Sequence, residues 1–368
     1  MGIQGFGTFL RKQNLSLFKP IGMSSLRGST LAIDMHFYTY KMFFRSNGTN
    51  VLDDVMRFCN RLDKHDMKAY FIFDGSTQGL KPAAHKKRKE QFDQKVKNHE
   101  KLADELEEVT AACEEEGIVF DEARVGEGEG IVIRTEVSPK RVKEEVKIEP
   151  SEVKEEEEPT KEERQALLLK KRIDLEEKMV KSSLYVQKPS HELFQEIKEY
   201  LTDRYGDAYV ITAQDDAERL CAIMCKGGEA EYVISSDYDT LAFGSPNLVI
   251  EFASSKMQIL HLEEILAELK MTLSQFIDFA ILCGCDYCGK VPGIGPKRAL
   301  AYIQKHKTIE GAFDEKLAPR FANPTQKDEF RFEFARQRFN HEEVPVIDRT
   351  GEEDGAKDEE SESGSKDE

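Results

Sequence analysis

Short apolar runs that end at an aspartate are the feature that most limits how this chain can fold. The runs are rich in β-branched and aromatic residues and span residues 30–33, 68–73, 208–212, 231–236 and 247–252. Asp34, Asp74 and Asp237 directly follow the first, second and fourth. Stretches with helical spacing separate several of them, which predicts an α/β fold with a mostly parallel central sheet flanked by helices.

The acidic residues are candidate ligands for metal ions. The full candidate set is Asp34, Asp74, Asp216, Glu218, Asp237, Asp239 and Asp286. Carboxyl ends of parallel strands share one edge of a sheet, so we expect these side chains to converge there, where ligands bind. Crowded carboxylates repel one another without cations, and Mg²⁺ prefers oxygen ligands. One aspartate after a strand is more often a turn residue or helix cap. The recurrence instead predicts a metal-dependent phosphodiesterase.

Positive charge is concentrated in two segments of a chain whose formal net charge is −17. Residues 85–101 and 164–181 contain more Lys and Arg than acids, whereas 126–163 and 349–368 are acidic. Local basic surfaces decide phosphate binding more than total charge does. The chain can therefore bind nucleic acid despite its acidic composition.

Lys81 and Arg88 lie in the first basic stretch, shortly after Asp74. A spacing of seven residues is about two helical turns, so the two side chains would share one helix face. Cations at that position could hold and polarise a phosphate. A solvated basic face or a nuclear localisation signal is the alternative interpretation.

A glycine-rich hairpin joins two predicted helices near residues 289–298. Gly293 and Gly295 allow a tight turn with close backbone approach, and Pro296 suits the first turn of a helix. The free amides of that helix, with Lys297 and Arg298, predict a clamp on a DNA phosphate backbone. An ordinary helix–turn–helix connection is the alternative.

Composition divides the chain into four segments. Charged helices are predicted over 83–116 and 161–181. An insert at 126–163 and a tail at 348–368 contain too few large apolar residues to form an ordered structure. The expected organisation is an N-terminal region, a disordered acidic insert, an internal region and a disordered acidic tail, at 1–125, 126–163, 164–347 and 348–368. No apolar run is long enough to span a membrane. Cys283, Cys285 and Cys288 lack a second pair at zinc-finger spacing, so a zinc site is not predicted.

Six motifs occur in the order in which the flap endonuclease family of structure-specific 5′ nucleases carries them. They are MGIQGF, LAIDMHFYTY, FIFDG, AQDDAERLCA, SSDYDTLAFGSP and GCDYCGKVPGIGPKRALAYIQKHKTIE. The chain resembles that family over about 1–125 and 185–347. The resemblance implies a helical arch, a helix–two-turn–helix motif, and cleavage of branched DNA near a 5′ flap in replication and repair.

The resemblance also implies roles for individual residues. The seven acids match the family's carboxylates for two Mg²⁺ ions, which Mn²⁺ can replace, and Lys81 and Arg88 match the catalytic basic pair of the arch. Tyr40 matches an aromatic on which a base stacks. Gly2 matches a terminal residue near the active site, which implies removal of Met1. The hairpin matches the motif that binds duplex DNA. Its backbone carbonyls are also candidate ligands for K⁺.

Some features depart from the family pattern. Position 216 is Asp where Glu is common, Asp215 adds an acid, and the tail lacks the usual sliding-clamp box, so a clamp partner is left open. The insert repeats Val-Lys-x-Glu, which resembles a SUMO acceptor pattern. We expect a monomer in the nucleus, or at a viral replication site if the chain is virus-encoded. The alternatives are a 5′→3′ exonuclease of the same superfamily, a non-catalytic junction-binding scaffold, and a regulatory platform.

Overall fold

The structure is a computed structural model that describes residues 2–75, 82–118 and 160–340. The chain divides into two compact units, one formed by Met1–Arg88 with Lys188–Glu368 and the other by Lys89–Gln187. Lys81, most of the predicted insert and the predicted tail lie outside the described residues.

The first unit is built on a sheet that has seven strands within the described residues, in the order β1-β7-β6-β5-β2-β3-β4. The strands are β1 (Lys19–Pro20), β2 (Thr30–Asp34), β3 (Lys68–Phe73), β4 (Val210–Thr212), β5 (Tyr232–Ile234), β6 (Asn247–Ile250) and β7 (Gln258–His261). Strands β6, β5, β2, β3 and β4 run parallel, and β7 and β1 pair antiparallel at one edge. The predicted, mostly parallel sheet is confirmed.

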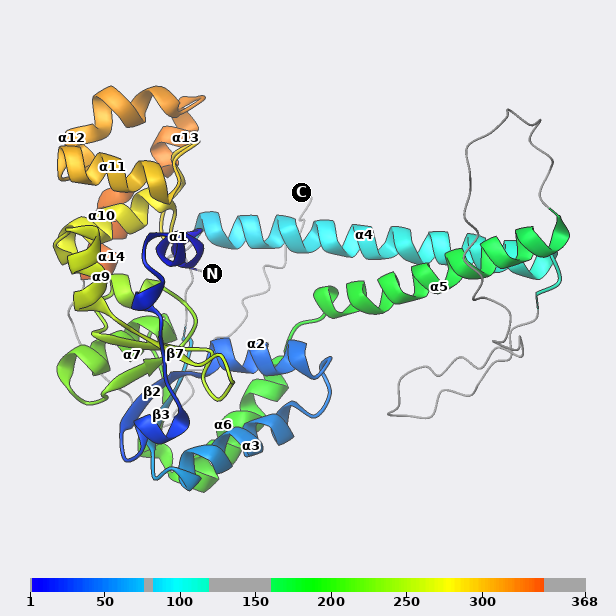
Figure 1. The fold of residues 1–368 in the computed structure, drawn as a ribbon, viewed down its shortest axis with the longest axis horizontal. Helices are drawn as coiled ribbons and strands as arrows, with labels where there is room; N and C mark the ends of the chain where they lie inside the picture. The colour runs from blue at the N-terminus through cyan, green and yellow to red at the C-terminus, as the bar shows by residue number, and fades with distance from the viewer. Residues whose placement is uncertain (1, 76–81, 119–159, 341–368) are drawn as a thin grey trace, which may run out of the picture. The chain divides into compact units, whose positions relative to one another are not determined.

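Helices cover both faces of the sheet because successive strand residues point to opposite sides. In β2, Ala32 belongs to one buried cluster, whereas Leu31 and Ile33 belong to another. Helix α7 (Ala217–Gly227) packs in the first cluster. The second cluster contains residues of α2 (Met35–Arg45), α3 (Val51–Lys64) and α6 (His191–Tyr205) (Figure 1).

The order of the strands reverses beside β2. The chain passes from β2 to β3 and β4 on one side, then returns to β5 on the other side of β2. Open α/β sheets bind ligands at such a switch point, beyond the carboxyl ends of the strands. Asp34 ends β2 and Asp237 follows β5, so both flank this point.

Several helices complete the first unit. They are α1 (Phe6–Gln13), α8 (Asp239–Ala242), α9 (Leu262–Leu269), α10 (Leu273–Cys283), α11 (Pro296–His306), α12 (Ile309–Ala312), α13 (Pro324–Glu329) and α14 (Phe332–Asn340). The predicted helical stretch 262–282 is divided into α9 and α10. Lys270 adopts a φ of 55°, which ends α9, and Thr272 with Gln275 forms a capping box that begins α10.

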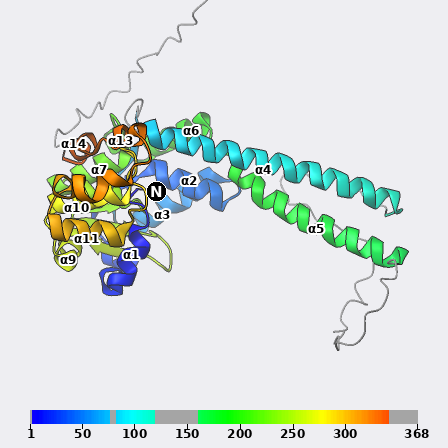
Figure 2. The same cartoon turned by 90° about the horizontal axis from the view of Figure 1, so that it is seen from above.

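The second unit is a hairpin of two long helices, α4 (Pro82–Glu115) and α5 (Lys161–Val186), which lie side by side (Figures 1 and 2). Val109, Cys113 and Leu175 are buried between them. The start of α4, through Arg88, belongs to the first unit. Helix α5 begins at Lys161, inside the segment predicted to be disordered, because Thr160 and Glu163 form a capping box. No helix in the described part of the chain combines the length and the apolar character that crossing a membrane requires.

Candidate active site

Asp34 is a buried carboxylate at the end of the central strand β2. It caps helix α2, because its Oδ1 accepts a bond from the Phe37 amide at 2.9 Å, and its Oδ2 accepts one from the Ser235 hydroxyl at 3.0 Å. Its exposed fraction is only 3%. Burial, and then the charge of Asp74, raise the pKa of Asp34 to about 7. A second carboxylate therefore lies close enough to oppose its ionisation.

Asp74 is held at the N-terminus of α7. Its Oδ1 accepts a bond from the Ala217 amide at 2.8 Å, a position where the helix dipole favours negative charge. Gly75 makes the approach possible, because a Cβ there would lie 1.8 Å from the Ala213 carbonyl oxygen. The Gly75 amide also donates to the Asp215 carbonyl at 2.7 Å. The loop after β3 is thus fixed against the start of α7.

Helix α7 itself contributes Asp216 and Glu218. Asp216 is the N-cap residue, Glu218 lies in the first turn, and both are buried. The Tyr287 hydroxyl donates to Asp216 Oδ2 at 2.8 Å. Burial, and then the charges of Asp216, Glu218 and Asp239, raise the pKa of Tyr287 well above its ordinary value. Tyr287 was not among the predicted site residues, although it directly follows Asp286 in the GCDYC motif.

Asp237 and Asp239 occupy the turn after β5. The Asp239 amide donates to Asp237 Oδ1 at 2.9 Å, and the Asp237 amide donates to Ser235 Oγ at 3.1 Å. Gly2 packs against both acids with a φ of +73°. A Cβ on Gly2 would lie 1.9 Å from Asp237 Oδ1 and 3.1 Å from Asp239 Cγ. The structure therefore places Gly2 beside Asp237 and Asp239.

Asp286 lies in the loop after α10 and is bonded by Arg88, whose guanidinium donates to Asp286 Oδ2. The geometry brings the predicted basic side chain to an acid of the candidate set. The second predicted member of that pair, Lys81, lies outside the described residues.

The buried Cys221 thiol reports that acids from different strands converge. Burial, and then the charges of Asp34, Glu218 and Asp74, raise its pKa well above the ordinary value. Charge from Asp237 also raises the pKa of Asp34. Asp34, Asp74, Asp237 and Glu218 therefore lie near one another at the carboxyl edge of the sheet.

The side chains of the candidate acids do not surround a single point. Among the described residues, no three His, Cys, Asp or Glu side chains are spaced to hold an ion directly. Backbone amides, hydroxyl groups and Arg88 orient the acids instead, as given above. The donor set still fits a divalent metal, because it consists of the hard oxygen ligands that Mg²⁺ and Mn²⁺ prefer. Charge repulsion on Asp34 is what such a cation would relieve.

Tyr40 lies beside the acids in a group of aromatic rings. Its ring centre is 5.3 Å from that of His36 and 6.2 Å from those of Phe44 and Phe194. Burial, and then the charge of Asp74, raise the pKa of Tyr40. His36 Nε2 lies 3.5 Å from Asp74 Oδ2. Sequence patterns alone did not indicate His36 or Phe194, since an aromatic at helical spacing is more often a core residue.

The hairpin between α10 and α11 has the expected tight turn. Gly293 has a φ of 71°, and Gly295 is the N-cap residue of α11. Lys297 and Arg298 are exposed. The Arg298 guanidinium donates to the Gly293 carbonyl at 2.5 Å, so this carbonyl of the hairpin already has a cationic partner.

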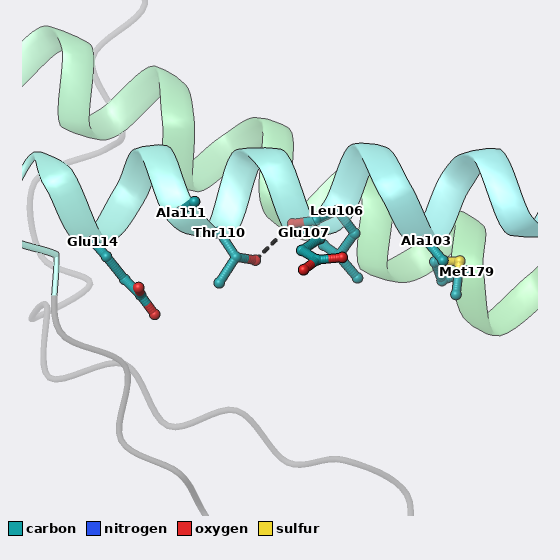
Figure 3. Close-up of a pocket in the computed structure, with 7 residues that line it drawn as sticks. All are labelled: Ala103, Leu106, Glu107, Thr110, Ala111, Glu114 and Met179. Atoms are coloured by element: carbon teal, nitrogen blue, oxygen red, sulfur yellow. Dashed lines mark hydrogen bonds between the residues drawn. The ribbon is translucent and has the colours of Figure 1, made fainter.

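A hollow of about 440 Å³ lies in the helical hairpin of the second unit (Figure 3). Its lining comes from α4 except for Met179 of α5, and the Thr110 hydroxyl within it donates to the Leu106 carbonyl at 2.7 Å. It contains none of the candidate site acids, and we assign it no role.

Comparisons with known proteins agree with this geometry. The XPG N-terminal domain model matches residues 1–95, and the XPG I-region model matches residues 208–286. A flap endonuclease 1 of Ostreococcus lucimarinus is 41% identical over 147 residues, which are 39% of this chain and 36% of that protein. A flap endonuclease 1 of Theileria parva is 27% identical over 84% of this chain and 52% of that protein. The chain thus spans about half or less of the length of these relatives.

A solved structure shows the same fold. The catalytic core of Rad2, solved in complex with a DNA substrate, superposes with a TM-score of 0.54 at 18% identity over 94% of this chain and 83% of that one. The matching segments of both family models contain predicted acids, from Asp34 in the first to Asp286 in the second. The chain is therefore similar in sequence to flap endonucleases over part of its length, and similar in fold to the catalytic core of Rad2.

Proposed function

We propose that this protein is a divalent-metal-dependent, structure-specific nuclease that hydrolyses DNA near the junction of a 5′ single-stranded flap and a duplex. The observation that carries the proposal is the acid group at the switch point of the sheet, contributed by the ends of β2, β3 and β5, the start of α7 and the loop after α10. Two similar proteins are flap endonucleases, and the similar Rad2 core was solved with a DNA substrate, which supports DNA as the substrate.

The acid group would hold two Mg²⁺ ions, for which Mn²⁺ could substitute. The proposed ligands are Asp34, Asp74, Asp216, Glu218, Asp237, Asp239 and Asp286. When bound, such ions lower the pKa of water and stabilise charge on the leaving oxygen of a phosphodiester. Burial of most of these carboxylates excludes bulk water, which strengthens their electrostatic attraction to a cation.

Basic and aromatic residues beside the acids would position the DNA. Arg88 already extends to Asp286, so its guanidinium can bind a phosphate oxygen that approaches the acid group. We assign Lys81 the same role from its motif. The half-buried Tyr40 ring offers a face on which a base can stack.

The hairpin would hold the duplex away from the cut. The backbone amides at Gly293 and Gly295 precede α11, and helix N-termini attract phosphate. The exposed Lys297 adds a charge, while Arg298 braces the turn through the Gly293 carbonyl. Contacts of this kind fix the register of a protein on DNA without selecting a sequence.

Cleavage of three labelled substrates tests the proposal. A 5′-flap duplex, a nicked duplex and a single strand are each incubated with Mg²⁺ or with EDTA. Asp237→Ala is compared with Asp203→Ala, a matched change of an exposed aspartate on α6. We expect Mg²⁺-dependent release of the flap as one oligonucleotide, lost in Asp237→Ala and kept in Asp203→Ala.

Two other outcomes would change the assignment. Release of mononucleotides from the nicked duplex would identify a 5′→3′ exonuclease of the same superfamily. Tight flap binding with no cleavage in any divalent metal would refute the enzymatic proposal and leave a junction-binding scaffold.

A further inference from the structure

Asp215, the additional acid directly before Asp216, is neutralised by two arginines. Its Oδ2 lies 3.1 Å from Arg219 Nη1 and 2.5 Å from Arg338 Nη2. All three side chains are largely buried, with exposed fractions of 8%, 3% and 13% for Asp215, Arg219 and Arg338. A buried carboxylate needs such partners. With two guanidinium groups bound, Asp215 is poorly suited to bind a metal.

Asp215 also fixes the backbone that presents the proposed metal ligands. Its Oδ1 accepts a bond from the Asp216 amide at 2.8 Å, which orients the N-cap of α7. Its carbonyl accepts the Gly75 amide at 2.7 Å, directly after Asp74. One residue therefore connects the loop of Asp74 to the helix that carries Asp216 and Glu218.

Arg338 comes from α14, a helix with no predicted site residue. Its guanidinium carbon lies 5.7 Å from the centre of the Tyr287 ring, and Phe339 contacts the same ring at 5.3 Å. Tyr287 in turn donates to Asp216 Oδ2. Helix α14 thus reaches Asp216 by two routes, through Asp215 and through Tyr287.

We propose that Asp215 and Arg338 are positioning residues that orient Asp216 and Glu218 for divalent-metal binding, which makes α14 part of the metal-binding architecture. The proposal rests on the proposed function. Partners that orient metal ligands typically change metal affinity by about 10- to 100-fold when removed. The effect should therefore appear in metal affinity before it appears in the maximal rate.

The test compares two arginines of the same helix. Arg338→Gln removes one of the two arginine partners of Asp215, and Arg336→Gln is the matched control. Arg336 lies two residues away and pairs with Asp278 at 2.7 Å and Glu310 at 2.6 Å, not with the acid group. Both changes loosen α14 by removing a buried ion pair. Arg338→Gln alone should affect the metal ligands.

Metal binding is measured directly by titrating the full chain with Mn²⁺ and following the free ion by electron paramagnetic resonance. The Mg²⁺ concentration for half-maximal flap cleavage is measured in parallel. We expect Arg338→Gln to weaken Mn²⁺ binding and raise the half-saturating Mg²⁺ by about 10-fold, with a smaller change in kcat at saturating Mg²⁺. Arg336→Gln should stay within about twofold of wild type in both.

Asp215→Asn supplies an independent check. Combined with Arg338→Gln, it should weaken Mn²⁺ binding no further than the stronger single change, because both act through one contact. If Arg336→Gln or Arg338→Gln unfolds the chain, Arg336→Lys and Arg338→Lys replace those variants, since lysine keeps the charge but not the forked geometry.

Equal effects of the two arginine changes, or a loss of kcat with unchanged Mn²⁺ binding, would overturn the positioning role. Failure of the proposed function looks different. Wild-type protein would then bind no Mn²⁺ at all, or would bind it without cleaving any substrate.

Discussion

Replacing Asp34 by asparagine should stabilise the metal-free protein at neutral and alkaline pH. The carboxylate is buried at the end of β2, and burial with the nearby charge of Asp74 raises its pKa from 3.8 to about 7. Asparagine has the same shape. Its oxygen can accept the Phe37 amide bond, and its amide can donate to the Ser235 hydroxyl, which now donates to Asp34.

The magnitude follows from the shift. Each pKa unit corresponds to about 1.4 kcal/mol, so a shift of roughly three units corresponds to about 4 kcal/mol. Below pH 3.8 the carboxyl group is protonated in both folded and unfolded chains. Between pH 3.8 and about 7 the unfolded chain releases the proton first, so the free energy of unfolding falls as pH rises. Above that range the whole cost is present in wild type and absent in Asp34→Asn.

Urea unfolding in EDTA, repeated from pH 4 to pH 8, measures this difference. We expect the two proteins to be nearly equal at the acidic end and Asp34→Asn to be more stable by about 2–4 kcal/mol at pH 8. Added Mg²⁺ should then stabilise wild type more than the variant, because a ligand that binds only the folded state stabilises it. A difference in stability that is the same at all pH values, or a less stable variant at pH 8, would refute the reasoning.

Three further changes test other parts of the structure. Tyr287→Phe removes the bond to Asp216 and should weaken Mn²⁺ binding about 10-fold with little loss of fold; unchanged binding in the same titration would contradict this. Gly2→Ala places a Cβ against Asp237 at a positive φ, and should lower flap cleavage at least 10-fold while urea stability stays near wild type. Leu175→Ala in the seam of the helical hairpin should cost about 2–3 kcal/mol locally and speed proteolysis within α5, without changing Mn²⁺ binding.

The parallel strands could be predicted because their apolar runs are continuous and their carboxyl ends carry acids. Residues 68–73 form β3 with the predicted bounds, and the run before Asp34 forms β2. The edge strands β1 and β7 were missed. Two residues in β1 and four in β7 are too few to show alternation, and their pairing depends on contacts distant in sequence.

Contacts distant in sequence also explain what was missed in the site. Asp34, Asp74 and Asp237 could be predicted together because each ends or follows a parallel strand, and the carboxyl ends of parallel strands lie at one edge of the sheet. The partners that orient them follow no such rule. Tyr287 donates to Asp216 from 71 positions away, and no local spacing predicts that bond.

The chemical partners of three buried acids differ from those of Asp34. Asp54, Asp215 and Asp278 are bonded by arginines, which satisfy their charge within the protein. Asp34 instead accepts bonds from a neutral amide and a neutral hydroxyl group. Neutral donors orient a carboxylate but leave its charge uncompensated, so the attraction for a cation is retained.

Asp286 is a candidate metal ligand, but it is also bonded by an arginine, Arg88, as those three buried acids are. An arginine so placed can exchange its carboxylate for a substrate phosphate, since both offer two oxygens to the forked guanidinium. Arrival of the phosphate would then free Asp286 for a metal at the same moment that it brings the scissile bond to the acids. On the proposed function, such an exchange would couple metal binding at Asp286 to substrate binding, whereas Asp34 is oriented by amide and hydroxyl partners within the protein.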